Sequence, residues 1–224
     1  MLEGFGPLVR KDLRLELRSG ESTVALVSLS LLILVVMVLA FGPGGARRAE
    51  VAAGALWVAL IFAGTLGANQ ALLAERESGC IRGLLLSPLE PATIYAAKLA
   101  VAMIFMTEAG VAVLAVLVLF FNLEFGAALA RLVPVFLLGA LGLAALCTLL
   151  ATVCGRVRAG AMLLPVLVVP LFTPALIAGC KASAALLAGQ PIGAVTTWLK
   201  LLAAFDVLFV TAGYLLFEHV ILED

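Results

Sequence analysis

Residues 51–83 read VAAGALWVALIFAGTLGANQALLAERESGCIRG, a long apolar run that ends in a short charged segment. The run from Val51 to Leu73 contains 23 residues and no charged side chain. A helix needs about 20 mostly apolar residues to cross a bilayer, and it satisfies its backbone polar groups internally where water is absent. The stretch therefore predicts a membrane-spanning helix followed by a polar element at a membrane surface.

The composition of the whole chain extends this interpretation. Of 224 residues, 64% are hydrophobic and 12% are charged, whereas soluble domains are typically about 45–50% apolar and about 25% charged. The sequence predicts an all-α membrane protein with a single transmembrane permease domain over residues 1–224 and no separate soluble domain. Six stretches qualify as spans: about 24–41, 51–73, 99–121, 132–153, 159–180 and 201–217.

The distribution of cations predicts the orientation. An even number of spans places both termini on one side of the membrane. With the N-terminus in the cytoplasm, nine Lys and Arg residues lie inside and five outside, as the positive-inside rule favours. We therefore expect both termini in the cytoplasm, together with the loop over residues 74–98 between the second and third spans.

The segment before the first span, residues 1–22, predicts an amphipathic helix. Its apolar side chains recur at helical spacing, and Arg10, Arg14 and Arg18 stack on the other side. This pattern is typical of an interfacial helix that meets anionic lipid head groups. Asp12 and Glu16 project into the apolar arc, so either they pair with neighbouring arginines or the helix faces protein rather than lipid.

Three polar side chains inside the predicted spans are candidates for a functional role: Glu108, Asp206 and Asn69. An ionisable group at membrane depth is costly and is a functional candidate by default. The structural alternative for Glu108 is a protonated carboxyl bonded to an adjacent helix. Asp206 lies near the interface, where an ion pair with Lys200 or a position reaching toward water is the alternative.

The sequence contains no motif for enzymatic chemistry. A phosphate-binding GxxxxGK[ST] loop, an HExxH pair and a Ser/His/Asp set are all missing. The single histidine, His219, and four dispersed cysteines predict neither a metal site nor a disulfide framework. A net charge of zero argues against nucleic acid as a partner. We therefore expect a non-enzymatic protein, and any ATP it uses must bind to another polypeptide.

The charged segment 74–83 has two interpretations on its residues alone. Glu75, Arg76 and Glu77 could begin a short helix in the membrane plane, which Pro88 and Pro91 would end. Its mixed charges suit the surface of a partner protein better than an anionic membrane. The alternative is a solvated loop between two helices.

The region from residue 54 to residue 98 resembles the CcmB family, the membrane subunit of the ABC transporter for cytochrome c maturation. The similarity is carried by GALWVALIFAGTLG at 54–67, Asn69, Glu75-Arg76-Glu77, LLLSP at 84–88, Ile94-Tyr95 and Lys98. It extends over nearly the whole chain, including the short basic N-terminal segment and the proline-rich fifth span. The outer loop around Lys181 to Lys200 departs most from the family pattern.

This resemblance implies an ABC-2-type exporter permease fold in a bacterial inner membrane. It implies two copies of this subunit paired with two copies of a CcmA-like ATPase, beside CcmC-like and CcmD-like membrane proteins. The loop between spans two and three would then be the coupling element that docks on the ATPase. That role falls on Glu75, Arg76, Glu77, Cys80 and Arg82.

The sequence does not identify the transported substrate. The resemblance implies either haem export or ATP-driven release of a haem-loaded chaperone at the periplasmic side, with haem handled rather than held as a resident cofactor. The sequence has no CxxCH haem motif. Two other hypotheses are an ABC-2 permease that exports a drug, lipid or polysaccharide, and a proton-coupled carrier that relies on Glu108 and Asp206.

Overall fold

The computed structural model describes residues 4–19, 21–42, 48–78, 90–121, 126–155, 157 and 160–222. Within these ranges the chain is helical and contains no strand. The helices are α1 (Phe5–Ser19), α2 (Glu21–Phe41), α3 (Arg48–Ser78), α5 (Pro91–Phe121), α6 (Ala127–Cys154), α7 (Gly160–Leu187), the short 3₁₀ helix η1 (Ile192–Val195) and α8 (Thr196–Leu222).

Five of the described helices are long and apolar enough to cross a bilayer: α3, α5, α6, α7 and α8. They confirm five of the six predicted spans. In α2, which matches the first predicted span, the described apolar segment is the shorter Leu31–Phe41. The all-helical fold class and the multi-pass character of the chain are therefore confirmed.

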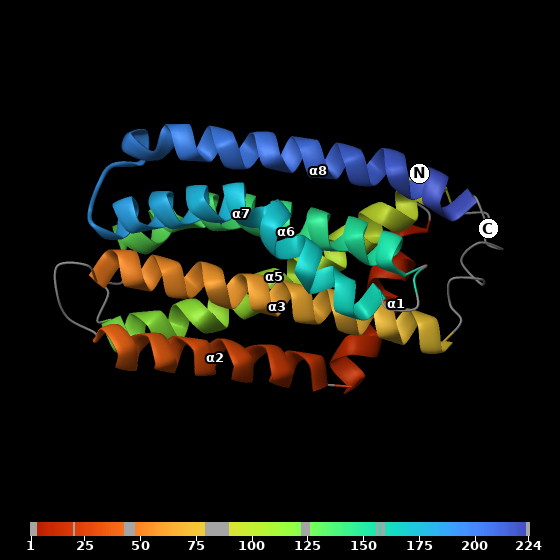
Figure 1. Cartoon of the computed structure of the whole chain (residues 1–224), viewed down its shortest axis with the longest axis horizontal. Helices are drawn as coiled ribbons and strands as arrows, with labels where there is room; N and C mark the ends of the chain where they lie inside the picture. Colours follow the sequence, from red (N-terminus) through yellow and green to blue (C-terminus); the bar gives the residue numbers. More distant parts are fainter. Residues whose placement is uncertain are drawn as a thin grey trace.

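The long helices run back and forth between two ends of the molecule (Figure 1). One end holds the close of α2, the start of α3 and the η1 segment that leads into α8. The other end holds α1, the close of α3 and the close of α8 (Figure 1). The last turn of α3, which carries part of the charged segment, thus lies at the same end as the N-terminal helix.

The helices around the charged segment extend beyond the predicted spans and into the predicted 74–98 loop. Residues 74–78 form the last turn of α3, and residues 91–98 form the first two turns of α5. Glu, Arg and Ala are good helix formers, so α3 continues past the end of its apolar run instead of stopping there. Pro91 suits the first position of a helix, where its missing N–H leaves no bond unmade.

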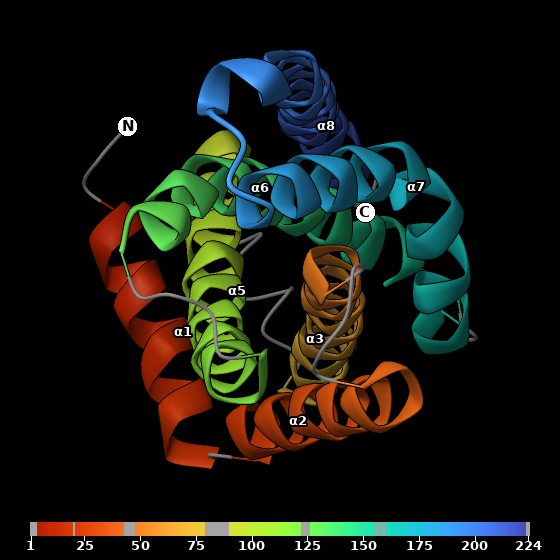
Figure 2. The same cartoon turned by 90° about the vertical axis from the view of Figure 1, so that its left-hand side faces the viewer.

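Helix α3 lies in the interior of the bundle. End-on, it is surrounded by α2, α5, α6 and α7 (Figure 2), and it contacts all four. Helix α8 packs chiefly on α6, with further contacts to α7 and α5. The uninterrupted apolar run of α3 allows most of its surface to be buried against these four helices.

Trp57 is the side chain around which α3, α6 and α7 meet. It is fully buried, and its indole lies against Gly139 of α6 and Gly179 of α7. Its Nε1–H donates a hydrogen bond of 3.0 Å to the Ser183 hydroxyl, one turn beyond Gly179. A Cβ atom at either glycine would overlap the ring. Close approach of helix backbones at small residues is the usual packing mode in membranes.

This arrangement predicts that Gly139→Ala destabilises the protein. The added methyl group meets the indole of Trp57, which is enclosed on all sides, and overpacking of this kind costs about 1–3 kcal/mol. Gly54→Ala is the matched control, because a Cβ there meets nothing within 4 Å and lies on the same helix as Trp57. Thermal unfolding in detergent should show a lower Tm for the first variant and an equal or higher Tm for the second. Equal values for both variants would contradict the packing.

Candidate functional site

Three of the five residues predicted to contact an ATPase lie at the end of the molecule that also holds α1. Glu75, Arg76 and Glu77 belong to the last turn of α3, so they extend a long helix rather than begin a separate short one. The orientation of their side chains lies outside what the structure describes, as do Cys80 and Arg82 altogether. The coupling role of these five residues stays a prediction.

Helix α1 packs against protein at this end. It contacts α5 and, less extensively, α2. Leu8 of α1 packs against a small cluster in which Tyr95 of α5 and Phe217 of α8 stack with ring centroids 5.6 Å apart. Within the predicted stretch 1–22 the structure describes the helix α1 from Phe5 to Ser19, and Leu8 turns part of its apolar side toward the bundle.

Of the two acidic residues in the apolar arc of α1, Asp12 has a structural explanation, whereas the side chain of Glu16 lies outside what the structure describes. Asp12 is only 25% exposed and forms a salt bridge of 3.3 Å with Lys11. Its carboxylate also interacts electrostatically with Lys98 near the start of α5. Of the two sequence alternatives, the one in which this side of the helix faces protein fits the contacts of Asp12.

Asp206 is the most deeply buried of the predicted polar candidates. It is 5% exposed, and neither of its carboxylate oxygens has a hydrogen-bond partner in the described part of the chain. Lys200 is exposed, and no salt bridge joins it to Asp206 in the described part of the chain, so the structure gives no support to the ion-pair alternative. The carboxylate instead packs onto Gly142 of α6, where a Cβ would lie 2.6 Å from Oδ1 and 2.9 Å from Phe205.

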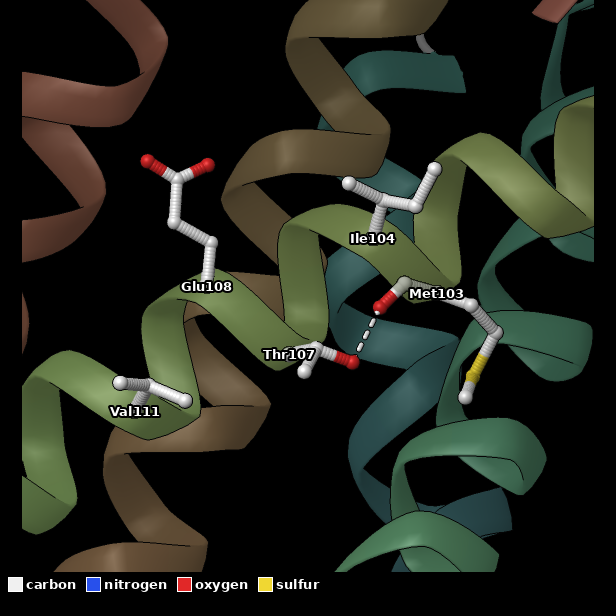
Figure 3. A pocket seen from close by; sticks show the side chains of 5 residues that line it. All are labelled: Met103, Ile104, Thr107, Glu108 and Val111. Carbon is white, nitrogen blue, oxygen red and sulfur yellow. Dashed lines mark hydrogen bonds between the residues drawn. The ribbon is translucent and has the colours of Figure 1, made fainter.

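Glu108, in contrast to Asp206, has an exposed side chain. It is exposed on α5, at the edge of an open hollow of about 420 Å³ that Met103, Ile104, Thr107 and Val111 also line. In Figure 3 its carboxylate points away from the other labelled side chains, while Thr107 turns back toward its own helix. The Thr107 hydroxyl donates a 2.7 Å hydrogen bond to the carbonyl of Met103.

Asn69 and its neighbour Gln70 lie near the charged end of α3. The side-chain carbonyl oxygens of both are buried, and neither has a partner among the described residues. Sequence reasoning named Asn69 but missed Gln70, although an amide pair at the end of an apolar run was visible. It also missed the Trp57–Ser183 hydrogen bond, because a serine 126 residues away gives no local signal.

The predicted polar candidates do not converge on one site. Asn69, Glu108 and Asp206 belong to α3, α5 and α8, and no described hydrogen bond joins them. No group of three or more His, Cys, Asp or Glu side chains that could hold a metal ion occurs among the residues that the structure describes. The geometry therefore describes separate polar positions in a packed bundle, each with its own environment.

Comparison with known proteins gives a consistent result over most of the chain. The sequence model of the family described as "CcmB protein" matches residues 4–221. Three curated relatives are each named "Heme exporter protein B". The relative from Bradyrhizobium diazoefficiens is 31% identical over 193 residues, which cover 84% of each chain. The relative from Paracoccus denitrificans is 32% identical over 176 residues, 78% of this chain and 80% of that protein. The relative from Pseudomonas aeruginosa is 28% identical over 204 residues, 89% of each chain.

The contact between Asp206 and Gly142 predicts a size-dependent rescue. Gly142→Ala should destabilise the protein by about 1–3 kcal/mol, because the new methyl group presses α8 away from α6. In a chain of this size that lowers the Tm by roughly 2–4 °C per kcal/mol. Adding Asp206→Ala should restore part of the loss, since it removes the carboxylate oxygen that the methyl group would meet at 2.6 Å and leaves the Phe205 ring at 2.9 Å. The near-isosteric Asp206→Asn is the control and should restore little. Equal rescue by Asp206→Ala and Asp206→Asn would show that the charge of Asp206, and not the space it fills, causes the destabilisation by Gly142→Ala.

Proposed function

The chain belongs to the CcmB family, and we propose that it is the permease subunit of an ABC transporter complex that serves c-type cytochrome biogenesis in the bacterial inner membrane. The observation that carries the proposal is the family match over residues 4–221, together with relatives that align over most of both chains. The multi-pass helical fold agrees with it. The chain is a non-catalytic transporter component, and ATP hydrolysis belongs to a separate ATPase subunit.

The dimensions of α3 suit the transmission of force. At 1.5 Å per residue its 31 residues extend about 46 Å, whereas the hydrocarbon layer is about 30 Å thick. The polar end of α3 therefore projects beyond that layer. Trp57 connects the same helix to α6 and α7 deep in the bundle. A displacement of the last turn of α3 by a partner protein would thus be transmitted to the packed core through one continuous helix.

This geometry supports a coupling role for the end of α3 and for the residues that follow it. In the proposal, Glu75, Arg76, Glu77, Cys80 and Arg82 contact a CcmA-like ATPase at the cytoplasmic face. The excess of Lys and Arg on that side supports the orientation. Both termini then lie in the cytoplasm, and an ABC-2-type arrangement of the spans accommodates a coupling element between the second and third.

The proposed complex contains further membrane subunits. Family membership favours an assembly with two copies of this chain and two copies of the ATPase. CcmC-like and CcmD-like membrane proteins complete it. The names of the three relatives point to haem, and they favour a haem-related role over export of a drug, lipid or polysaccharide. The ATP-driven step is either movement of haem itself or release of a haem-loaded chaperone at the periplasmic side.

Charge reversal at the end of α3 tests the coupling role. We expect Glu75→Lys with Glu77→Lys to reduce co-purification of the ATPase subunit at least about tenfold and to abolish cytochrome c maturation. Opposite charges meeting across a contact are replaced by like charges, which costs several kcal/mol in a close interface.

Glu50→Lys is the matched control, because Glu50 is an exposed carboxylate in the first turn of the same helix, at the far end of the bundle. It should leave both readouts unchanged. Normal ATPase binding and normal maturation in the double variant would contradict the coupling role. Lost maturation with the ATPase still bound would place the defect in force transmission rather than in docking.

A further inference from the structure

Helix α1 lies across the bundle rather than along it. In Figure 1 it runs across the long axis of the molecule, at the end that also holds the close of α3 and of α8. In Figure 2 it is seen side-on at the rim of the bundle, whereas α3, α5 and α8 are seen end-on. It contacts α5 and α2. A helix with this orientation beside membrane spans lies in the plane of the bilayer.

The packing of Leu8 fixes the depth of α1 in the membrane. Leu8 packs against the cluster of Tyr95 and Phe217. At 1.5 Å per residue, Tyr95 lies about 6 Å from the start of α5 and Phe217 lies about 8 Å from the end of α8. Helix α5 extends about 46 Å, which exceeds a centred hydrocarbon layer of about 30 Å by about 8 Å at each end. Leu8 therefore lies at the boundary between the hydrocarbon and the lipid head groups.

The described residues of α1 divide into two sides. One side is exposed, and its residues recur at intervals of three and four: Pro7, Arg10, Lys11 and Arg14. Leu8 and Asp12 lie on the other side of the helix and are less exposed. That side faces protein, because Leu8 packs on the cluster around Tyr95 and Asp12 interacts electrostatically with Lys98 of α5. The exposed side therefore points away from the bundle.

The charged residues on this exposed side, Arg10, Lys11 and Arg14, are all cations, and we call them the cationic face of α1. Lys11 forms the 3.3 Å salt bridge with Asp12. Arg10 and Arg14 lie one turn apart, where their side chains are neighbours on the helix surface. The planar guanidinium group matches the geometry of a phosphate and donates two hydrogen bonds to it. A uniform set of cations at head-group depth suits an acidic lipid surface, whereas the mixed charges of the segment 74–83 suit a protein.

We infer that the cationic face of α1 binds the phosphate groups of acidic phospholipids and so anchors α1 beside the start of α5. The bilayer holds one side of the helix through Arg10 and Arg14, and the bundle holds the other through Leu8. Each Lys or Arg near an acidic membrane surface contributes about a fivefold gain in affinity. Two arginines should therefore favour an acidic over a zwitterionic lipid by at least about tenfold. The inference applies to either orientation of the chain and does not depend on what the transporter moves.

Photolabelling of the full chain in lipid nanodiscs tests this binding. The nanodiscs consist of phosphatidylcholine with a small fraction of a photoreactive lipid, either phosphatidylglycerol or phosphatidylcholine, with the reactive group at the same position near the head group. After irradiation, mass spectrometry measures the labelled fraction of the peptide that contains residues 5–19. We expect phosphatidylglycerol to label this peptide at least about tenfold more than phosphatidylcholine does.

Substitutions of the two arginines test the source of this preference. Arg10→Gln with Arg14→Gln should bring the ratio of the two labelled fractions close to one, whereas Arg10→Lys with Arg14→Lys should keep most of it, because the charge is retained. Lys181→Gln with Lys200→Gln is the matched control. It removes two exposed cations at the opposite end of the bundle and should leave the ratio at α1 unchanged.

High salt gives a second measurement if the glutamine variant has a lower Tm than the unaltered chain. Salt at about 1 M shortens the Debye length to about 3 Å, compared with about 8 Å at physiological ionic strength. The ratio of the two labelled fractions in the unaltered chain should then fall in the same way.

Equal labelling of α1 by the two lipids in the unaltered chain would overturn the inference. A preference that survives both the glutamine substitutions and high salt would overturn it as well. A ratio unchanged by the glutamine substitutions, together with loss of the co-purifying ATPase, would show that the cationic face meets a protein instead. Because the labelling requires neither the ATPase nor haem, its failure and a failure of the proposed transporter function are separate results.

Discussion

The indole of Trp57 between two glycines is the interaction on which the rest of the bundle depends. Inside a bilayer, lipid tails are as apolar as leucine, so burial alone gives helices little reason to associate. Close packing and interhelical hydrogen bonds have to supply the attraction. Trp57 supplies both, because its ring fills the space left by Gly139 and Gly179 while its N–H reaches Ser183 at 3.0 Å. Three helices distant in sequence are thereby held in one register.

The same principle of a large side chain against a small one recurs through the molecule. Gly110 accommodates Phe136, Gly64 accommodates Met106, and Gly213 accommodates Tyr95. In each pair the two partners lie on different helices. Gly142 follows the rule with a polar partner, since the carboxylate of Asp206 occupies the space beside it. These interface glycines thus make room for a side chain of a neighbouring helix, and at these positions the missing side chain matters more than backbone freedom.

The two carboxylates at membrane depth differ in what surrounds them. Asp206 is enclosed between α6 and α8, where its environment is entirely set by this chain. Glu108 faces outward from α5, so its environment is set by whatever covers that helix. Charge in a bilayer is expensive in both places. The first carboxylate is therefore held by contacts within the folded chain, whereas the second is exposed in the described part of the chain.

Sequence alone determined the helical class, the position of five long spans and the family, because apolar length and an extended local pattern suffice for these. It also named Glu108 and Asp206, since charge within an apolar run is visible without a structure. It did not determine that α3 continues to Ser78, because the end of an apolar run marks a membrane boundary and not a helix boundary. Only the tertiary structure decided which carboxylate is buried and which glycine receives Trp57. The physical reason is that helices are local in sequence, whereas the side of a helix that meets protein depends on partners that lie dozens to more than a hundred residues away.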